Sequence, residues 1–183
     1  MEDKQIADFE GRLVDNLLRI GRDNGLTDNK LLQTEDIGKR WQELAPEYMA
    51  DAVPAVQDYP TFSVGCALYL GMAVAWGWDA DWGTYKDAEY KSYYGDQGFD
   101  NMDDHIVEHL YGLRKWTTEA KQFQDKVKQL AEATVTAIRH EGVEPQSQQA
   151  FYLFHSACKV MFFMGASIGL KRLGYKLEKV NFN

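Results

Sequence analysis

Residues 61–78 read TFSVGCALYLGMAVAWGW, and none of these side chains carries a charge. Pro60 stands directly before the stretch, where proline is common because the first helical residue needs no N–H donor. The small residues Ala67, Gly71 and Ala75 recur at every fourth position and so lie on one helix face. Such a face lets a second helix approach closely. The stretch therefore predicts a helix that is buried at the centre of the fold.

A membrane-spanning helix is the alternative for this stretch. A span needs about 20 predominantly apolar residues, and this run is shorter and rich in small side chains. Asp58 and Asp79 flank it, whereas Lys and Arg are the residues that typically flank membrane helices. These features favour a core helix in a protein that does not enter the membrane.

A second apolar stretch follows Pro145 and continues to Leu173, with Gly174 in the position of a helix cap. An offset of 92 residues between the two stretches gives four identities. They pair Phe62 with Phe154, Cys66 with Cys158, Met72 with Met164, and Gly77 with Gly169. Two glycine-bearing apolar helices can match this well by chance, and a decayed duplication with a pseudo-twofold axis is the other explanation.

Amphipathic helices are predicted on either side of this central pair. Apolar residues of segment 3–23 recur at helical spacing, and Asn24 with Gly25 forms a typical C-terminal cap. Thr34 is a typical N-cap for a helix that we expect to stop at Pro46. The remaining helices are predicted over residues 47–53, over residues 101–113 with Asp100 as the cap, and over residues 119–140.

No segment shows the alternation of a β-strand. We therefore expect one all-α domain over residues 1–183, a helical bundle of about five main helices with the helices at 60–78 and 146–173 in the centre. A chain of this length buries roughly 70% of its unfolded surface, so the fold requires neither a metal nor a disulfide. Cys66 and Cys158 lie in apolar runs and are expected to be buried free thiols.

The composition excludes some functions. The 183 residues include 20 Lys and Arg against 28 Asp and Glu, a formal net charge of −8. Nucleic acid is therefore not expected as a partner, because basic side chains must replace the counterions of the phosphates. The chain starts without the pattern of a secretion signal, which favours the cytoplasm. Common phosphate-loop and G-x-S-x-G motifs are absent, and the sequence leaves open whether the protein is an enzyme.

Segment 79–101 is acidic, rich in aromatic residues and longer than a bundle connection needs. Tyr and Trp provide large contact areas at low entropic cost, so the rings are predicted to form a contact surface; alternatively, they close one end of the bundle. The first functional hypothesis is a non-catalytic protein-interaction module that forms homo-oligomers or binds another protein. The predicted surface comprises Trp78, Trp82, Tyr85, Tyr90, Tyr93, Tyr94 and Phe99.

The string His105-Ile106-Val107-Glu108-His109 gives the second functional hypothesis, a metal-binding protein or a metal-dependent hydrolase. One helical turn separates the two histidines, so both rings can ligate one divalent transition metal. A metal-bound water would then act as the nucleophile. The alternative is a solvated helix face, and no other cofactor is indicated. The candidate ligands are His105, His109, Asp104 and Glu108, with His140 or His155 added from another helix.

Overall fold

The computed structural model describes residues 2–176 and shows six α-helices in a single bundle, with no β-strand in the part of the chain that it describes. The prediction of an all-α bundle is confirmed. Two 3₁₀ turns, Tyr90–Tyr93 and Phe99–Asn101, precede α4, and a π-helical turn, Ile106–Leu110, follows it. The helices are α1 (Glu2–Asp23), α2 (Glu35–Ala55), α3 (Pro60–Tyr85), α4 (Met102–His105), α5 (Thr118–His140) and α6 (Gln148–Arg172).

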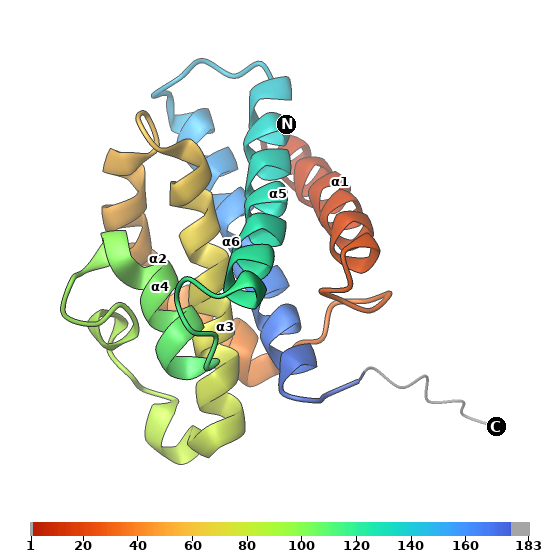
Figure 1. The fold of residues 1–183 in the computed structure, drawn as a ribbon. Helices are drawn as coiled ribbons and strands as arrows, with labels where there is room; N and C mark the ends of the chain where they lie inside the picture. The colour runs from red at the N-terminus through yellow and green to blue at the C-terminus, as the bar shows by residue number, and fades with distance from the viewer. Residues whose placement is uncertain (1, 177–183) are drawn as a thin grey trace.

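Helices α3 and α6 lie at the centre of the bundle (Figure 1). Helix α1 packs against α5 and α6, α2 packs against α3 and α6, and α5 also contacts α3. By length and composition alone, α3 and α6 could each cross a membrane, but 78% and 83% of their most apolar windows are buried inside the protein. The two apolar stretches thus form the core that the outer helices cover.

The two central helices cross at a pair of glycines. A Cβ atom on Gly71 would overlap the carbonyl oxygen of Phe162, and a Cβ atom on Gly165 would overlap the carbonyl oxygen of Leu68. Backbone therefore meets backbone at both points, and only a residue without a side chain fits there. The alanines one turn away on either side of Gly71 are fully buried. The small-residue face predicted from the sequence is confirmed.

Several helix ends are capped, and the caps at Thr34 and Gly25 are those predicted from the sequence. The Thr34 hydroxyl accepts a hydrogen bond from the Ile37 N–H at 3.2 Å, and Ser147 accepts one from Ala150 at 3.1 Å at the start of α6. Gly25, just after α1, has a φ of 71°, the left-handed conformation that glycine adopts without a steric cost. These caps satisfy backbone groups that a helix end would otherwise leave unpaired.

Three predicted boundaries are wrong. Helix α2 continues through Pro46 to Ala55 instead of stopping and restarting. Helix α3 extends past residue 78 to Tyr85, with non-helical torsion angles at Asp81. The segment 101–113 forms one α-helical turn and then the π-helical turn, and Asp100 lies in a 3₁₀ turn and does not cap the helix.

Packing explains why Pro46 does not end α2. An internal proline costs about 3 kcal/mol because it removes a hydrogen bond and crowds the preceding turn. Ala45, Met49 and Ala52 are all buried against the bundle. A continuous helix therefore removes apolar side chains on both sides of the proline from water, which stabilises it. Tertiary contacts here outweigh the local preference of the chain.

Candidate functional site

The segment between α3 and α4, residues 86–101, is called the aromatic connector here, and it folds back onto α2. Tyr90 and Tyr93 are 2% and 7% exposed. The Tyr90 hydroxyl donates a hydrogen bond to the Asp51 carboxylate at 2.8 Å, and the buried Arg40 guanidinium donates to the Tyr93 hydroxyl at 3.3 Å. Arg40 also donates to the carbonyl of Ala88. The expectation that these two rings face outward is wrong, because α2 supplies polar partners that let both tyrosines be buried.

The other five predicted surface rings are partly buried: Trp78, Trp82, Tyr85, Tyr94 and Phe99. Phe99 lies edge-on to the rings of Tyr48 and Phe62, with centroid distances of 6.0 and 5.5 Å. Tyr85 packs edge-on against Trp76 at 5.1 Å. This arrangement agrees with the alternative in which the connector closes one end of the bundle.

His105 and His109 lie side by side, and their ring centroids are 4.9 Å apart. Burial and the neighbouring His109 lower the pKa of His105, and the negative charge of Asp96 partly offsets this effect. His105 also packs against Gly95 of the connector, where a Cβ atom would crowd its Nδ1 atom. The predicted pairing of the two imidazoles on one side is therefore present.

The remaining candidate ligands do not complete a metal centre with this pair. The Asp104 carboxylate accepts a hydrogen bond from Gln124 at 3.1 Å and forms an ion pair with Lys115 at 3.4 Å. Over residues 2–176, no group of three or more His, Cys, Asp or Glu side chains is placed to hold a metal ion. Glu108, His140 and His155 therefore join no three-ligand cluster with His105 and His109.

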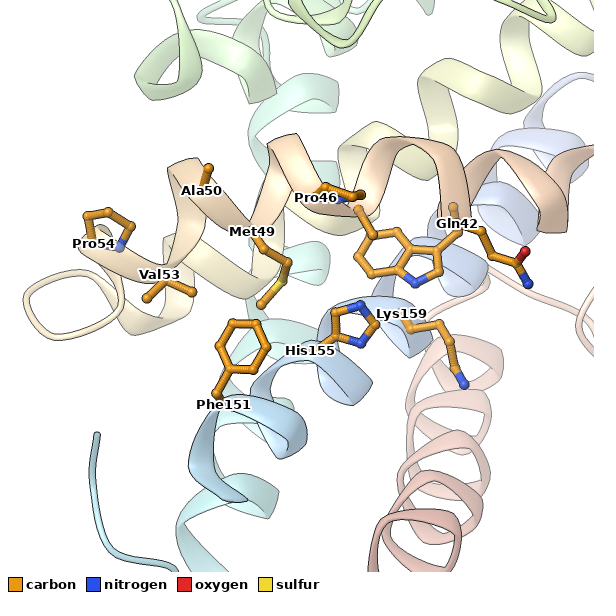
Figure 2. Close-up of a pocket in the computed structure, with 11 residues that line it drawn as sticks. Gln42, Pro46, Met49, Ala50, Val53, Pro54, Phe151, His155 and Lys159 are labelled. Atoms are coloured by element: carbon orange, nitrogen blue, oxygen red, sulfur yellow. The ribbon is translucent and has the colours of Figure 1, made fainter. Parts of the chain in front are cut away.

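A groove of about 860 Å³ runs between α2 and α6, and Figure 2 shows its lining side chains. Its volume lies within the usual range for binding clefts. Phe151 is 42% exposed and Val53 is 38% exposed, and both line it. Tyr152 is 41% exposed, and its ring packs against that of Phe151. The lining consists of Trp41, Gln42, Ala45, Pro46, Met49, Ala50, Val53, Pro54, Phe151, His155 and Lys159.

Two prolines change the hydrogen bonding along the α2 wall of the groove. Pro46 and Pro54 have no N–H, so the carbonyl oxygens of Gln42 and Ala50 receive no hydrogen bond from the residue four positions later. All four residues line the groove. The α2 wall therefore combines apolar side chains with backbone acceptors that the helix itself does not fully use.

The groove carries little net charge. The Lys159 ammonium forms an ion pair with Glu10 of α1 at 2.6 Å, and Figure 2 shows this side chain extending toward a neighbouring helix. His155 packs between Trp41 and Phe151, with centroid distances of 5.5 and 6.4 Å. Burial and then Lys159 lower the pKa of His155, whereas Glu10 opposes the shift. The imidazole is therefore neutral near pH 7.

The lowered pKa of His155 predicts a contribution to stability that disappears in acid. The unfolded chain takes up a proton at the ordinary histidine pKa of about 6.5, and the folded chain does so only at lower pH. Protonation therefore favours the unfolded state, and the free energy of unfolding falls as the pH drops below about 6.5. The facing charged groups are Lys159 and Glu10, since the α2 wall contributes no titratable residue.

Urea titrations of the wild type and of His155→Gln at several pH values measure this effect. We expect the variant to lose less stability than the wild type between neutral and acidic pH. The comparison with the variant is needed because His105 also has a lowered pKa and contributes to the pH dependence of the free energy of unfolding in the wild type. Equal pH slopes for the two proteins would contradict the assignment to His155.

Two spacings in the sequence indicate this groove, although the groove was not predicted from them. Pro46 and Pro54 are eight residues apart and fall on the same face if the helix is continuous. Phe151, His155 and Lys159 recur at every fourth position along α6. The expectation that α2 ends at Pro46 hid the first pattern, because it divided that face between two helices.

Comparison of the chain with models of protein families, with curated proteins and with solved structures gave no match. The chemistry and shape of the surfaces of this chain are therefore the basis for its function.

Proposed function

We propose that this protein is a non-catalytic protein-interaction module that pairs with a second copy of itself through the α2–α6 groove. The observation that supports this proposal is the gathering of exposed apolar side chains at one place. Val53, Phe151 and Tyr152 lie at or beside the groove, whose α2 wall also exposes Pro46, Ala50 and Pro54. Apolar surface of this kind marks interaction sites, because covering it removes it from water.

A second copy of the chain suits the groove because of charge. The chain has a net charge of −8, so most pairs of surfaces on two copies repel each other. In a two-fold dimer the same patch lies on both sides of the contact. The charge of Lys159 is compensated by Glu10, and His155 is neutral near pH 7, so two grooves can meet without uncompensated like charges.

The backbone acceptors of α2 support the same arrangement. The carbonyl oxygens of Gln42 and Ala50 need donors once they are covered, because a buried unpaired acceptor is costly. The side-chain amide of Gln42 lines the groove and has two N–H donors. A self-complementary face thus presents both acceptors and a donor to its partner. For this reason the proposed surface is the groove and not the connector, whose Tyr90 and Tyr93 are buried.

Methionine methyl groups provide a test of this contact. Met49 lines the groove, whereas Met72, Met102, Met161 and Met164 are fully buried in the core. In an NMR dilution series of methyl-labelled protein, we expect the Met49 resonance to shift with concentration while these four stay constant. A constant Met49 resonance would contradict the proposal. Equal shifts of all five would indicate a global change and also contradict it.

Metal binding at His105 and His109 is the second candidate function, and the side-by-side imidazoles support it. Two ligands hold a divalent ion weakly compared with the three or four protein ligands of known zinc sites. We therefore expect untagged protein to retain clearly less than one metal ion per chain in elemental analysis. One tightly bound ion that is lost in a His105→Ala/His109→Ala variant would contradict this expectation and establish the metal hypothesis.

A further inference from the structure

A second cavity, of about 580 Å³, shares no lining residue with the groove. It is bounded by the start of α3, by α4 and by the middle of α5. Its size lies within the usual range for small-molecule sites. Unlike the groove, it combines aromatic rings with several carboxylates, so a different chemistry must fill it.

The carboxylates of the cavity are not fully compensated by cations. Asp58, Asp103, Asp104 and Asp125 line it, and Lys128 is the one basic lining residue in the part of the chain that the structure describes. Lys115, outside the lining, pairs with Asp104. No Lys, Arg or His among the described residues forms an ion pair with Asp103. Burial raises the pKa of Asp103 and the charge of Asp104 adds to the effect, whereas backbone N–H groups and the positive charge of Lys115 partly offset it.

Tyr69 is an independent indication that the cavity takes a ligand. Its side chain lines the cavity and is only 6% exposed. No side chain or backbone group within residues 2–176 forms a hydrogen bond with its hydroxyl group, which is therefore open to a partner in the cavity. Burial raises the pKa of this hydroxyl, and the negative charges of Asp103 and Asp104 add to the effect; the acids and the phenol also line the same cavity. A ligand with hydrogen-bond donors would satisfy both groups.

The lining fits an organic cation better than a metal ion. The carboxylates are too dispersed to surround one ion, since no three-ligand cluster exists over residues 2–176. The rings of Tyr59, Phe62 and Tyr69 also line the cavity, and aromatic faces attract ammonium groups but do not ligate hard metal ions. We propose that this cavity binds a small organic ammonium ion, with the Asp103 carboxylate and the Tyr69 hydroxyl holding the N–H donors and the aromatic rings covering the apolar body.

Phenethylammonium is a suitable probe, because it joins an ammonium group to an aromatic body. We expect saturable binding to the wild type by isothermal titration calorimetry at low ionic strength and neutral pH. The neutral analogue 2-phenylethanol, with nearly the same shape, should bind at least about tenfold more weakly, because it lacks the charge-assisted hydrogen bond. Titrations with Mg²⁺ and Ca²⁺ separate an organic-cation site from a metal site.

Substitutions assign the site to particular groups. Asp103→Asn keeps the shape and removes the charge, and we expect it to weaken phenethylammonium binding about tenfold. Tyr69→Phe removes only the hydroxyl and should weaken it about threefold. Asp15→Asn is the matched control. Asp15 is exposed on α1, and its substitution changes the net charge by the same amount as Asp103→Asn. Circular dichroism confirms that each variant is folded.

A substitution at Gly65 tests the cavity itself. An added Cβ there would meet the Ala131 Cβ at 3.7 Å, an ordinary contact, so Gly65→Ala should fold normally while it occupies cavity volume. We expect weaker phenethylammonium binding in this folded variant. The proposal is overturned if phenethylammonium shows no saturable binding at millimolar concentration, if 2-phenylethanol binds equally well, or if only Mg²⁺ or Ca²⁺ binds. It is also overturned if Asp103→Asn and Asp15→Asn have equal effects.

Discussion

Gly165→Ala is expected to lower the free energy of unfolding by about 3 kcal/mol or more, the upper end of the range for overpacked cores. The new methyl group would overlap the carbonyl oxygen of Leu68, which belongs to the α3 backbone. A backbone atom cannot rotate away as a side chain can, so α3 and α6 must move apart and lose packing along their contact. Urea denaturation monitored by circular dichroism measures the change.

Three further variants sharpen this prediction. Gly11→Ala on α1 is the control, because an added Cβ there meets nothing within 4 Å. We expect it to raise stability by up to about 1 kcal/mol through helix propensity alone. Gly71→Ala should be as damaging as Gly165→Ala, and the double variant should cost less than the sum, because the first substitution already separates the helices. If Gly165→Ala left the free energy of unfolding unchanged, the two helices would not cross at these residues.

Phe151→Glu is expected to raise the dissociation constant of the proposed homodimer by about thirtyfold or more, as loss of a central interface residue worth roughly 2 kcal/mol does. Phe151 lines the groove and is 42% exposed in a single chain, so the substitution has little effect on the core. Two glutamates would also face each other across the two-fold axis. Size-exclusion chromatography with light scattering over a range of concentrations measures the constant.

Trp116→Glu is the matched control for this experiment. Trp116 is 91% exposed and lies in the loop before α5, outside the groove. It undergoes the same change from an aromatic to an acidic side chain, with the same change in net charge. We expect it to leave the dissociation constant within about threefold of the wild type, because rim and distant charges affect association weakly. If both substitutions weakened dimerisation equally, the groove would not be part of the interface.

The central helix pair was predictable because its signal is local. Eighteen uncharged residues and the repeat of small residues through Gly71 indicate a buried helix with a close neighbour, and the crossing with α6 at Gly165 agrees. The N-cap at Thr34 was predictable for the same reason. The duplication suggested by the offset of 92 residues stays a prediction, since nothing in the fold tests it.

The connector and the groove were not predictable because they depend on contacts between distant residues. Arg40 and Tyr93 are 53 positions apart in the chain, and Asp51 and Tyr90 are 39 apart. The composition of the connector favours a surface position for both tyrosines. No local pattern reveals that Arg40 and Asp51 provide the polar contacts that allow the two rings to be buried. Likewise, Pro46 is a helix terminator by local preference, and only the packing of α2 on the bundle keeps the helix continuous.

Sedimentation equilibrium of the unmodified protein decides most directly whether the chain pairs with itself. We predict an average mass that rises reversibly with concentration from the 21.0 kDa of one chain toward twice that value and then stays constant. The plateau is expected because a two-fold contact uses the same face on both copies and leaves none free. A mass that stays at 21.0 kDa at every concentration, or one that continues to rise beyond two chains, would contradict the proposed dimer.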